Sequence, residues 1–286
     1  MTKLSFRPMI LRRLLLGVAL GCCSLSGIAD DYCDFTVNNI HYKFIPNTTN
    51  EVAVSYEEYE SGRYGGYYSS YSGSVTIPAA VTYNSVTYKV TAVGNGAFAE
   101  HSVTSVNLPN TITSIGRYAF GDCSRLYMVN LPQSIKSIGE SAFSGCIALN
   151  SITIPNGVQS IENNTFANCQ SLSSISIPNG VTTIGSSAFS NCSNLRNVSF
   201  PSTIESVGNN AFYGTAWLSN LPAGLTYVGK VAFKYSGTMP SDTDVTLKEG
   251  TTSIASAAFS GCSGLRSIDI PNSVFSIGSG AFTNCI

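Results

Sequence analysis

A ladder of phenylalanines spaced 23 residues apart constrains this chain more than any other feature. Five residues keep the interval without a slip: Phe120, Phe143, Phe166, Phe189 and Phe212. A fixed period of this length is typical of a solenoid, in which one small structural unit is stacked on copies of itself. Nine Phe positions from Phe98 to Phe282, with Phe233 counted among them, predict about nine coils.

The unit at residues 149–169 shows how each coil is built. Ile152 and Ile154 alternate with polar neighbours, as in a half-buried strand, and Pro155 ends that strand before a turn. The apolar residues that follow bring the chain back across the other side. No unit contains a ten-residue helical stripe, so the pattern predicts a β-rich solenoid with parallel strands and little helix.

The repeat pattern L-x-x-I-x-I-P, followed by I-G-x-x-A-F-x-x-C, resembles the BspA-type leucine-rich repeat. The match covers residues 93–286, and residues 30–92 resemble the β-rich leader of secreted members, notably in segments 35–42 and 86–94. The resemblance implies a small β-rich N-terminal cap over residues 30–92 and a leucine-rich repeat solenoid over residues 93–286. Members of this family are typically secreted or surface-exposed, and some act as adhesins for host matrix proteins.

Residues 1–29 have the features of an export signal. A basic start is followed by a short apolar core at residues 14–20 and by a small-x-small cleavage site at residues 27–29. Two alternatives are an amphipathic segment that stays attached and lipoprotein processing at Cys22. No later segment is apolar for long enough to span a bilayer. We therefore expect an exported chain that is secreted or held at the cell surface.

The repeat pattern is irregular at two places. Between Phe212 and Phe259 the ladder intervals change, and Trp217 appears. That stretch predicts either a distinct binding segment with Tyr227 and Tyr235, or a register adjustment in which Trp217 fills the gap. The pattern also stops at Ile286 before the next strand would begin, so we expect a truncated product or a fragment. A natural end completed by dimerisation is the alternative, and the oligomeric state stays open.

The composition excludes some classes of partner. Charged residues make up 11% of the chain, under half of the roughly 25% usual for soluble domains, and the formal net charge is −1. There is no basic patch or arginine-rich run. The sequence therefore predicts no binding of nucleic acid.

Six cysteines recur at one position of the repeat. They are Cys123, Cys146, Cys169, Cys192, Cys262 and Cys285. Because a small apolar side chain would suit this core position, we expect buried free thiols, with disulfides between neighbouring coils as the alternative. No C-x-x-C motif or Cys/His cluster indicates a metal site.

The chain offers little that could carry out catalysis. His41 and His101 are its only histidines, and neither has a nearby Cys or a Ser-Asp arrangement in the sequence. The acidic residues are scattered rather than clustered on one face. We expect no enzymatic activity and no cofactor.

Two surfaces are candidates for binding. The first is the outward row beside the first strand of each coil, which is small and polar: Asn107, Asn130, Thr153, Ser176, Ser199 and Asp269. The second is a tyrosine-rich loop with Gly and Ser: Tyr56, Tyr59, Tyr64, Tyr67, Tyr68 and Tyr71. The alternatives are a merely solvated sheet face and a mobile loop with no ligand.

These features favour an exported repeat protein that binds an extracellular protein or polysaccharide without covalent chemistry. Host matrix proteins and glycans are the expected targets. The alternative is a structural spacer that displays a domain encoded beyond the C-terminus.

Overall fold

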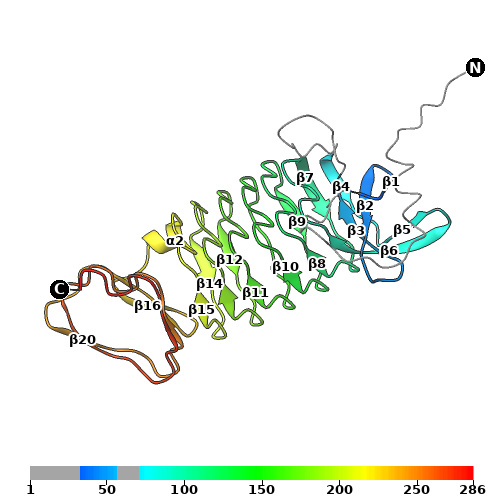
Figure 1. The fold of residues 1–286 in the computed structure, drawn as a ribbon. Coiled ribbons are helices and arrows are strands. Elements are labelled where there is room, and N and C mark those ends of the chain that lie inside the picture. The colour runs from blue at the N-terminus through cyan, green and yellow to red at the C-terminus, as the bar shows by residue number, and fades with distance from the viewer. Residues whose placement is uncertain (1–32, 57–70, 286) are drawn as a thin grey trace, which may run out of the picture. The chain divides into compact units, whose positions relative to one another are not determined.

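The computed structural model describes residues 33–56 and 71–285, all within one compact unit, residues 31–286 (Figure 1). The expected signal peptide with its Cys22 lies outside the described residues. So do Ile286 and four tyrosines of the expected loop, which are Tyr59, Tyr64, Tyr67 and Tyr68. Within the described ranges, no helix is long and apolar enough to cross a membrane.

The N-terminal part is a β-sheet that leads directly into the coils. Its strands are β1 (Phe35–Val37), β2 (Ile40–Phe44), β3 (Glu51–Ser55), β5 (Ala80–Tyr83) and β6 (Val86–Val93). β1, β2 and β3 pair antiparallel, whereas β3 pairs with β6 in parallel. β5 pairs antiparallel with β6. The aromatic ring of Phe35 stacks on Tyr83 with the ring centroids 4.3 Å apart, which gives this sheet its own apolar cluster.

Most coils contribute one strand to a first series, which carries the predicted polar row. This series consists of β4 (Ser72–Thr76), β7 (Ser102–Asn107), β9 (Met128–Asn130), β12 (Ser174–Ser176), β14 (Asn197–Ser199), β18 (Thr243–Thr246) and β20 (Leu265–Asp269). The parallel groups are β4-β7-β9, β12-β14 and β18-β20. Ile175 is buried between the exposed Ser174 and Ser176, so alternation within the strand separates core from face.

A second series of short strands runs along the other side of the coils. It consists of β8 (Ser114–Ile115), β10 (Ser137–Ile138), β11 (Ser160–Ile161), β13 (Thr183–Ile184), β15 (Ser206–Val207), β17 (Val231–Ser236), β19 (Ser253–Ile254) and β21 (Ser276–Ile277). The parallel groups are β8-β10, β11-β13-β15 and β17-β19-β21, and β6 of the N-terminal sheet pairs with β8. The predicted β-solenoid with parallel strands and almost no helix is confirmed, with about eight turns where the Phe positions predicted about nine.

The phenylalanine ladder forms the centre of the core. From Phe98 to Phe212, successive rings are stacked with centroids 5.0 to 5.5 Å apart and interplanar angles of 11° or less. All six rings are buried. Since one coil cannot bury its own apolar edge, these stacked contacts between coils are what stabilises the fold.

The ladder cysteines are free thiols that line the same core. Cys146 donates a hydrogen bond from Sγ to the carbonyl oxygen of Phe120 one coil earlier, at 3.0 Å. Cys123, Cys169, Cys192 and Cys285 make the same contact with their own preceding coils. Each of these five thiols therefore donates a hydrogen bond to the main-chain carbonyl of a ladder Phe. Burial raises the pKa of Cys123 to about 12.

The assignment of Phe233 to the ladder was wrong. β16 (Gly224–Val228) and β17 form an antiparallel hairpin, and β17 pairs with β19 so that Ala232 faces Ile254. Tyr235 takes the ladder position, because its N–H donates to the Ala258 carbonyl just before Phe259, as ladder Phe N–H groups do in regular coils. The Phe233 ring instead meets Phe212 edge-on at 6.0 Å.

Candidate binding face

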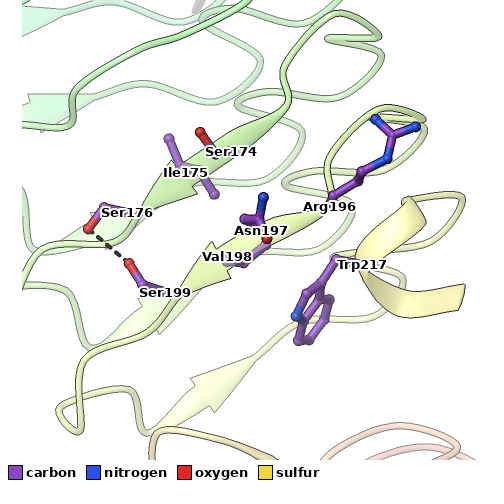
Figure 2. Close-up of a pocket in the computed structure, with 8 residues that line it drawn as sticks. All are labelled: Ser174, Ile175, Ser176, Arg196, Asn197, Val198, Ser199 and Trp217. Atoms are coloured by element: carbon purple, nitrogen blue, oxygen red, sulfur yellow. Dashed lines mark hydrogen bonds between the residues drawn. The ribbon is translucent and has the colours of Figure 1, made fainter. Parts of the chain in front are cut away.

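The predicted polar row lies in register along the first strand series. Asn107 pairs with Asn130 across β7 and β9, and Ser176 pairs with Ser199 across β12 and β14. The Ser199 hydroxyl donates to the Ser176 hydroxyl at 2.9 Å (Figure 2). Thr153 occupies the corresponding place in the coil between β9 and β12, outside any strand.

Asp269 lies apart from the rest of this row. It is on β20, which pairs with β18 in a separate two-stranded group. The neighbouring side chains there are charged: Asp244 accepts hydrogen bonds from Arg266 and Ser267, which lower its pKa to about 2. The sequence row therefore consists of one neutral block ending at β14 and a charged block beyond the irregular coil.

The neutral block contains two adjoining depressions. One has a volume of about 350 Å³ and is lined by residues 128–131, 151–153 and 174–176. The other, of about 450 Å³, is lined by residues 174–176, 196–199 and Trp217 (Figure 2). Because both are lined by residues 174–176, they adjoin at β12 and together make one open, shallow groove that extends from β9 to Trp217 beside β14. We call it the strand-face groove.

The lining of the strand-face groove is rich in hydroxyl and amide groups. Its exposed polar side chains are Asn130, Ser151, Thr153, Ser174, Ser176, Asn197 and Ser199. Hydroxyl and amide side chains both donate and accept hydrogen bonds, so this surface can match a ligand with either kind of group. The apolar contribution at the β9 end comes from Met128, whose side chain is exposed.

A short helix closes the groove at its other end. α2 (Ala216–Ser219) replaces the strand that a regular coil would place beside β14. Thr215 stands where other coils have the ladder Cys, and its hydroxyl caps the helix by accepting from the Leu218 N–H at 3.1 Å. Trp217 N–H donates to the Leu195 carbonyl at 2.7 Å, which holds the helix against the preceding coil.

Trp217 is held by three phenylalanines. Its ring lies 4.8 Å from Phe212, 5.3 Å from Phe200 and 5.6 Å from Phe233, measured between ring centroids. The side chain is only half-buried and also lines the groove (Figure 2). Trp217 thus fills the gap left by the missing strand, as one reading of the sequence predicted, and at the same time forms the end wall of the groove.

The two tyrosines grouped with Trp217 make contacts away from the groove. The Tyr227 hydroxyl accepts from the Lys248 N–H at 3.0 Å, and the Lys248 ammonium lies 4.4 Å from the centre of the ring. Tyr235 packs against Phe259 in the ladder. Neither residue lines the groove with Trp217.

Arg196 is the one charged side chain that lines the groove. It stands at the start of β14, is exposed, and takes part in no ion pair with any residue that the structure describes. Sequence reasoning missed this residue because it considered only the two outward positions of the strand itself. Arg196 directly precedes the strand, at the position where the previous coil has Ser173. Comparing that position between coils would have shown a charged side chain in place of a hydroxyl.

Tyr71 belongs to the core and not to an exposed loop. Its hydroxyl accepts from the His41 N–H at 2.8 Å and donates to the Ser55 carbonyl at 3.1 Å. Its ring lies 4.7 Å from that of Phe98, and burial raises its pKa. We therefore remove Tyr71 from the candidate loop. Tyr56 is half-buried, and the other four tyrosines of the loop lie outside the described residues.

A cysteine does lie near one histidine, which the sequence spacing did not indicate. Cys33 Sγ is 3.8 Å from His41 Nδ1, because β1 and β2 fold back on each other. The Thr36 hydroxyl is closer to the same nitrogen, at 2.8 Å. Among the described residues, no group of three His, Cys, Asp or Glu side chains is placed to hold a metal ion.

Comparison with known proteins assigns the repeat to a family. The family model for the BspA type leucine rich repeat region matches residues 91–219 and 216–286, in six copies. This chain belongs to the BspA-type leucine-rich repeat family. The family match and the stacked coils describe the same part of the chain, so the fold predicted from the resemblance is confirmed.

Several solved structures are similar to this chain. A leucine rich cell surface protein from Faecalibacterium prausnitzii is 27% identical, with 88% of this chain and 74% of that chain covered and a TM-score of 0.56. A leucine-rich repeat protein from Bacteroides ovatus is 24% identical, covering 88% and 80%, with a TM-score of 0.42. The pneumococcal vaccine antigen PcpA is 19% identical, covering 88% and 68%, with a TM-score of 0.46. No curated protein matches the sequence.

Proposed function

We propose that this BspA-type repeat protein is exported and binds an extracellular macromolecule through the strand-face groove, without catalysis. The observation that carries the proposal is the groove itself: adjoining depressions across several coils, lined by exposed hydrogen-bonding side chains and ending at Arg196 and Trp217. The expected export signal at residues 1–29 and the similar cell surface protein from Faecalibacterium prausnitzii support a location outside the cell.

The mechanism would be non-covalent and distributed over the coils. Each coil offers the same few hydrogen-bonding groups, repeated at a spacing of about 4.8 Å between strands. Individual exposed hydrogen bonds contribute little, roughly 1 kcal/mol each, so affinity would come from several coils contacting one extended ligand. A host matrix protein or a glycan remains the expected target.

A binding screen of residues 30–286 tests the proposal. The purified chain would be applied to immobilised matrix proteins and to a glycan array at physiological salt. We expect saturable binding that is lost in a variant with Thr153→Glu and Ser176→Glu, because both positions are exposed in the groove and a carboxylate there would be buried by the ligand.

The matched control places the same charges on the opposite side of the same coils. Gln159→Glu and Thr182→Glu change exposed residues that directly precede β11 and β13 of the second strand series, and should leave binding unchanged. Equal loss of binding in both double variants would contradict a role for the groove. A folded chain that binds nothing would favour the second prediction, a structural spacer.

A further inference from the structure

The side chains of the strand-face groove suit a carbohydrate better than a protein. The cores of protein interfaces are enriched in aromatic residues, Met and Arg, and depleted in Ser. Here most of the exposed lining side chains between β9 and β14 are Ser, Thr or Asn. Hydroxyl and amide groups that can donate and accept match the hydroxyl groups of a sugar chain. A repeated surface also suits a polymer built from repeated polar units.

The α2 end of this groove differs from the rest in two ways. Trp217 presents a half-buried indole whose position is fixed by Phe200, Phe212 and Phe233. A side chain that is already immobilised loses little conformational entropy when a ligand binds. The indole is apolar on its faces, so it can pack against the C–H face of a sugar ring.

The second difference is the positive charge of Arg196. Its guanidinium has no ion-pair partner among the described residues, and the groove lining contains no acidic side chain to neutralise it. Guanidinium and carboxylate groups form paired, charge-assisted hydrogen bonds. Figure 2 shows Arg196 and Trp217 on either side of Asn197 at the start of β14, with the Arg196 side chain extending away from the indole.

From this arrangement we propose that the α2 end of the groove binds an acidic sugar of an extracellular polysaccharide. Arg196 pairs with the sugar carboxylate, Trp217 packs against the ring, and the neutral part of the groove holds the neighbouring sugars. From β9 to β14 the groove spans three coil spacings, about 14 Å at ~4.8 Å each, which accommodates a short oligosaccharide. The inference rests on the proposed binding function of the groove and specifies its ligand class.

Trp217 is the single tryptophan of the chain, so its fluorescence reports on this site alone. Residues 30–286 would be titrated with three carboxylated probes: oligogalacturonate, a hyaluronan oligosaccharide and sialyllactose. Each would be compared with its methyl ester, which removes the charge and keeps the sugar chain. We expect at least one acid to change the Trp217 emission saturably and to bind about tenfold more tightly than its ester.

Two variants locate the charge effect. Arg196→Gln should abolish the preference for the acid over its ester. Lys136→Gln, which removes an exposed cation directly before β10 on the other side of the coils, should leave that preference unchanged. Raising the salt concentration should weaken binding of the acid more than that of the ester. Together these results would support recognition of the carboxylate by Arg196.

Other outcomes separate this inference from the proposed function. Equal binding of acid and ester, or an unchanged preference in Arg196→Gln, would overturn the acidic-sugar assignment. So would the absence of any emission change with all three acids. In each case the groove would still be a binding site if a ligand from the screen were lost in the Thr153→Glu and Ser176→Glu variant. If the groove variant retained its ligand, the proposed function would fail as well.

Discussion

Acid should destabilise the N-terminal part of this protein through His101. This side chain is only 5% exposed, and its ring lies 5.5 Å from that of the buried Tyr71. Removal from water disfavours the charged imidazolium, and the nearby His41 acts in the same direction. Together they lower the pKa of His101 from 6.5 to about 4.

The sign and size of the effect follow from linkage. Between pH 6.5 and pH 4 the unfolded chain binds a proton at His101 that the folded chain does not bind. Stability contributed by the neutral imidazole is therefore fully present above pH 6.5 and is lost as the pH falls towards 4. At 1.36 kcal/mol for each pKa unit, the free energy of unfolding falls by about 3 kcal/mol over this range.

Urea unfolding of residues 30–286 at pH 7, 5.5 and 4 measures this loss, and hydrogen exchange locates it in β2, β3 and the first coil. Carboxylates also titrate in this range, so the decisive quantity is the difference from His101→Gln, which cannot titrate. Between pH 7 and pH 4, we expect the free energy of unfolding of the variant to fall by about 3 kcal/mol less than that of the native chain. Equal losses in the two proteins would refute the reasoning, because the acid sensitivity would then arise elsewhere.

Three further predictions concern the coils. Phe166→Ala, in mid-ladder, should lower the free energy of unfolding in urea by about 3–5 kcal/mol, whereas Phe275→Ala, at a side chain 70% exposed, should have little effect. Ala257 has a φ of 54°, in the left-handed region, and the equivalent residue one coil later is Gly280. Because Asn tolerates this region better than Ala, Ala257→Asn should raise the melting temperature by relieving about 1 kcal/mol of strain. Ellman's reagent at pH 8 should modify only the half-buried Cys33 and Cys285 of residues 30–286 until urea is added, since the other five thiols are buried and burial raises the pKa of Cys123, Cys146, Cys169 and Cys262; fast reaction of all seven would contradict this.

Wherever the period holds, the sequence was sufficient to predict the core. An apolar residue that recurs every 23 positions packs against the equivalent residues of the coils before and after it, so its burial follows from the spacing alone. This argument correctly predicted the stacked rings from Phe98 to Phe212 and the buried Cys positions. It failed at Phe233, where V-G-K-V-A-F imitates the repeat pattern. The β16–β17 hairpin shifts the register there, and Tyr235 takes the ladder position instead.

The assignment of Tyr71 to the candidate loop was wrong for a different reason. Composition alone treats every tyrosine of a Gly- and Ser-rich stretch as equivalent. Tyr71 is nevertheless the last residue before β4, and that strand pairs with β7. Pairing with the first coil brings its ring onto Phe98, which no local pattern could indicate. Whether a residue at the boundary of a loop is buried depends on which strand pairs with the strand that adjoins the loop.

The irregular coil is what distinguishes one place on the strand face from all others. In a perfectly regular solenoid, a ligand bound across several coils could shift by one repeat and find the same contacts again. Such a surface gives affinity but no defined position. The loss of a strand after β14 breaks this equivalence, because it introduces Trp217 beside Arg196 at one end of the groove. Restoring the regular repeat there would extend the polar face and, on this reasoning, remove its selectivity for an acidic sugar.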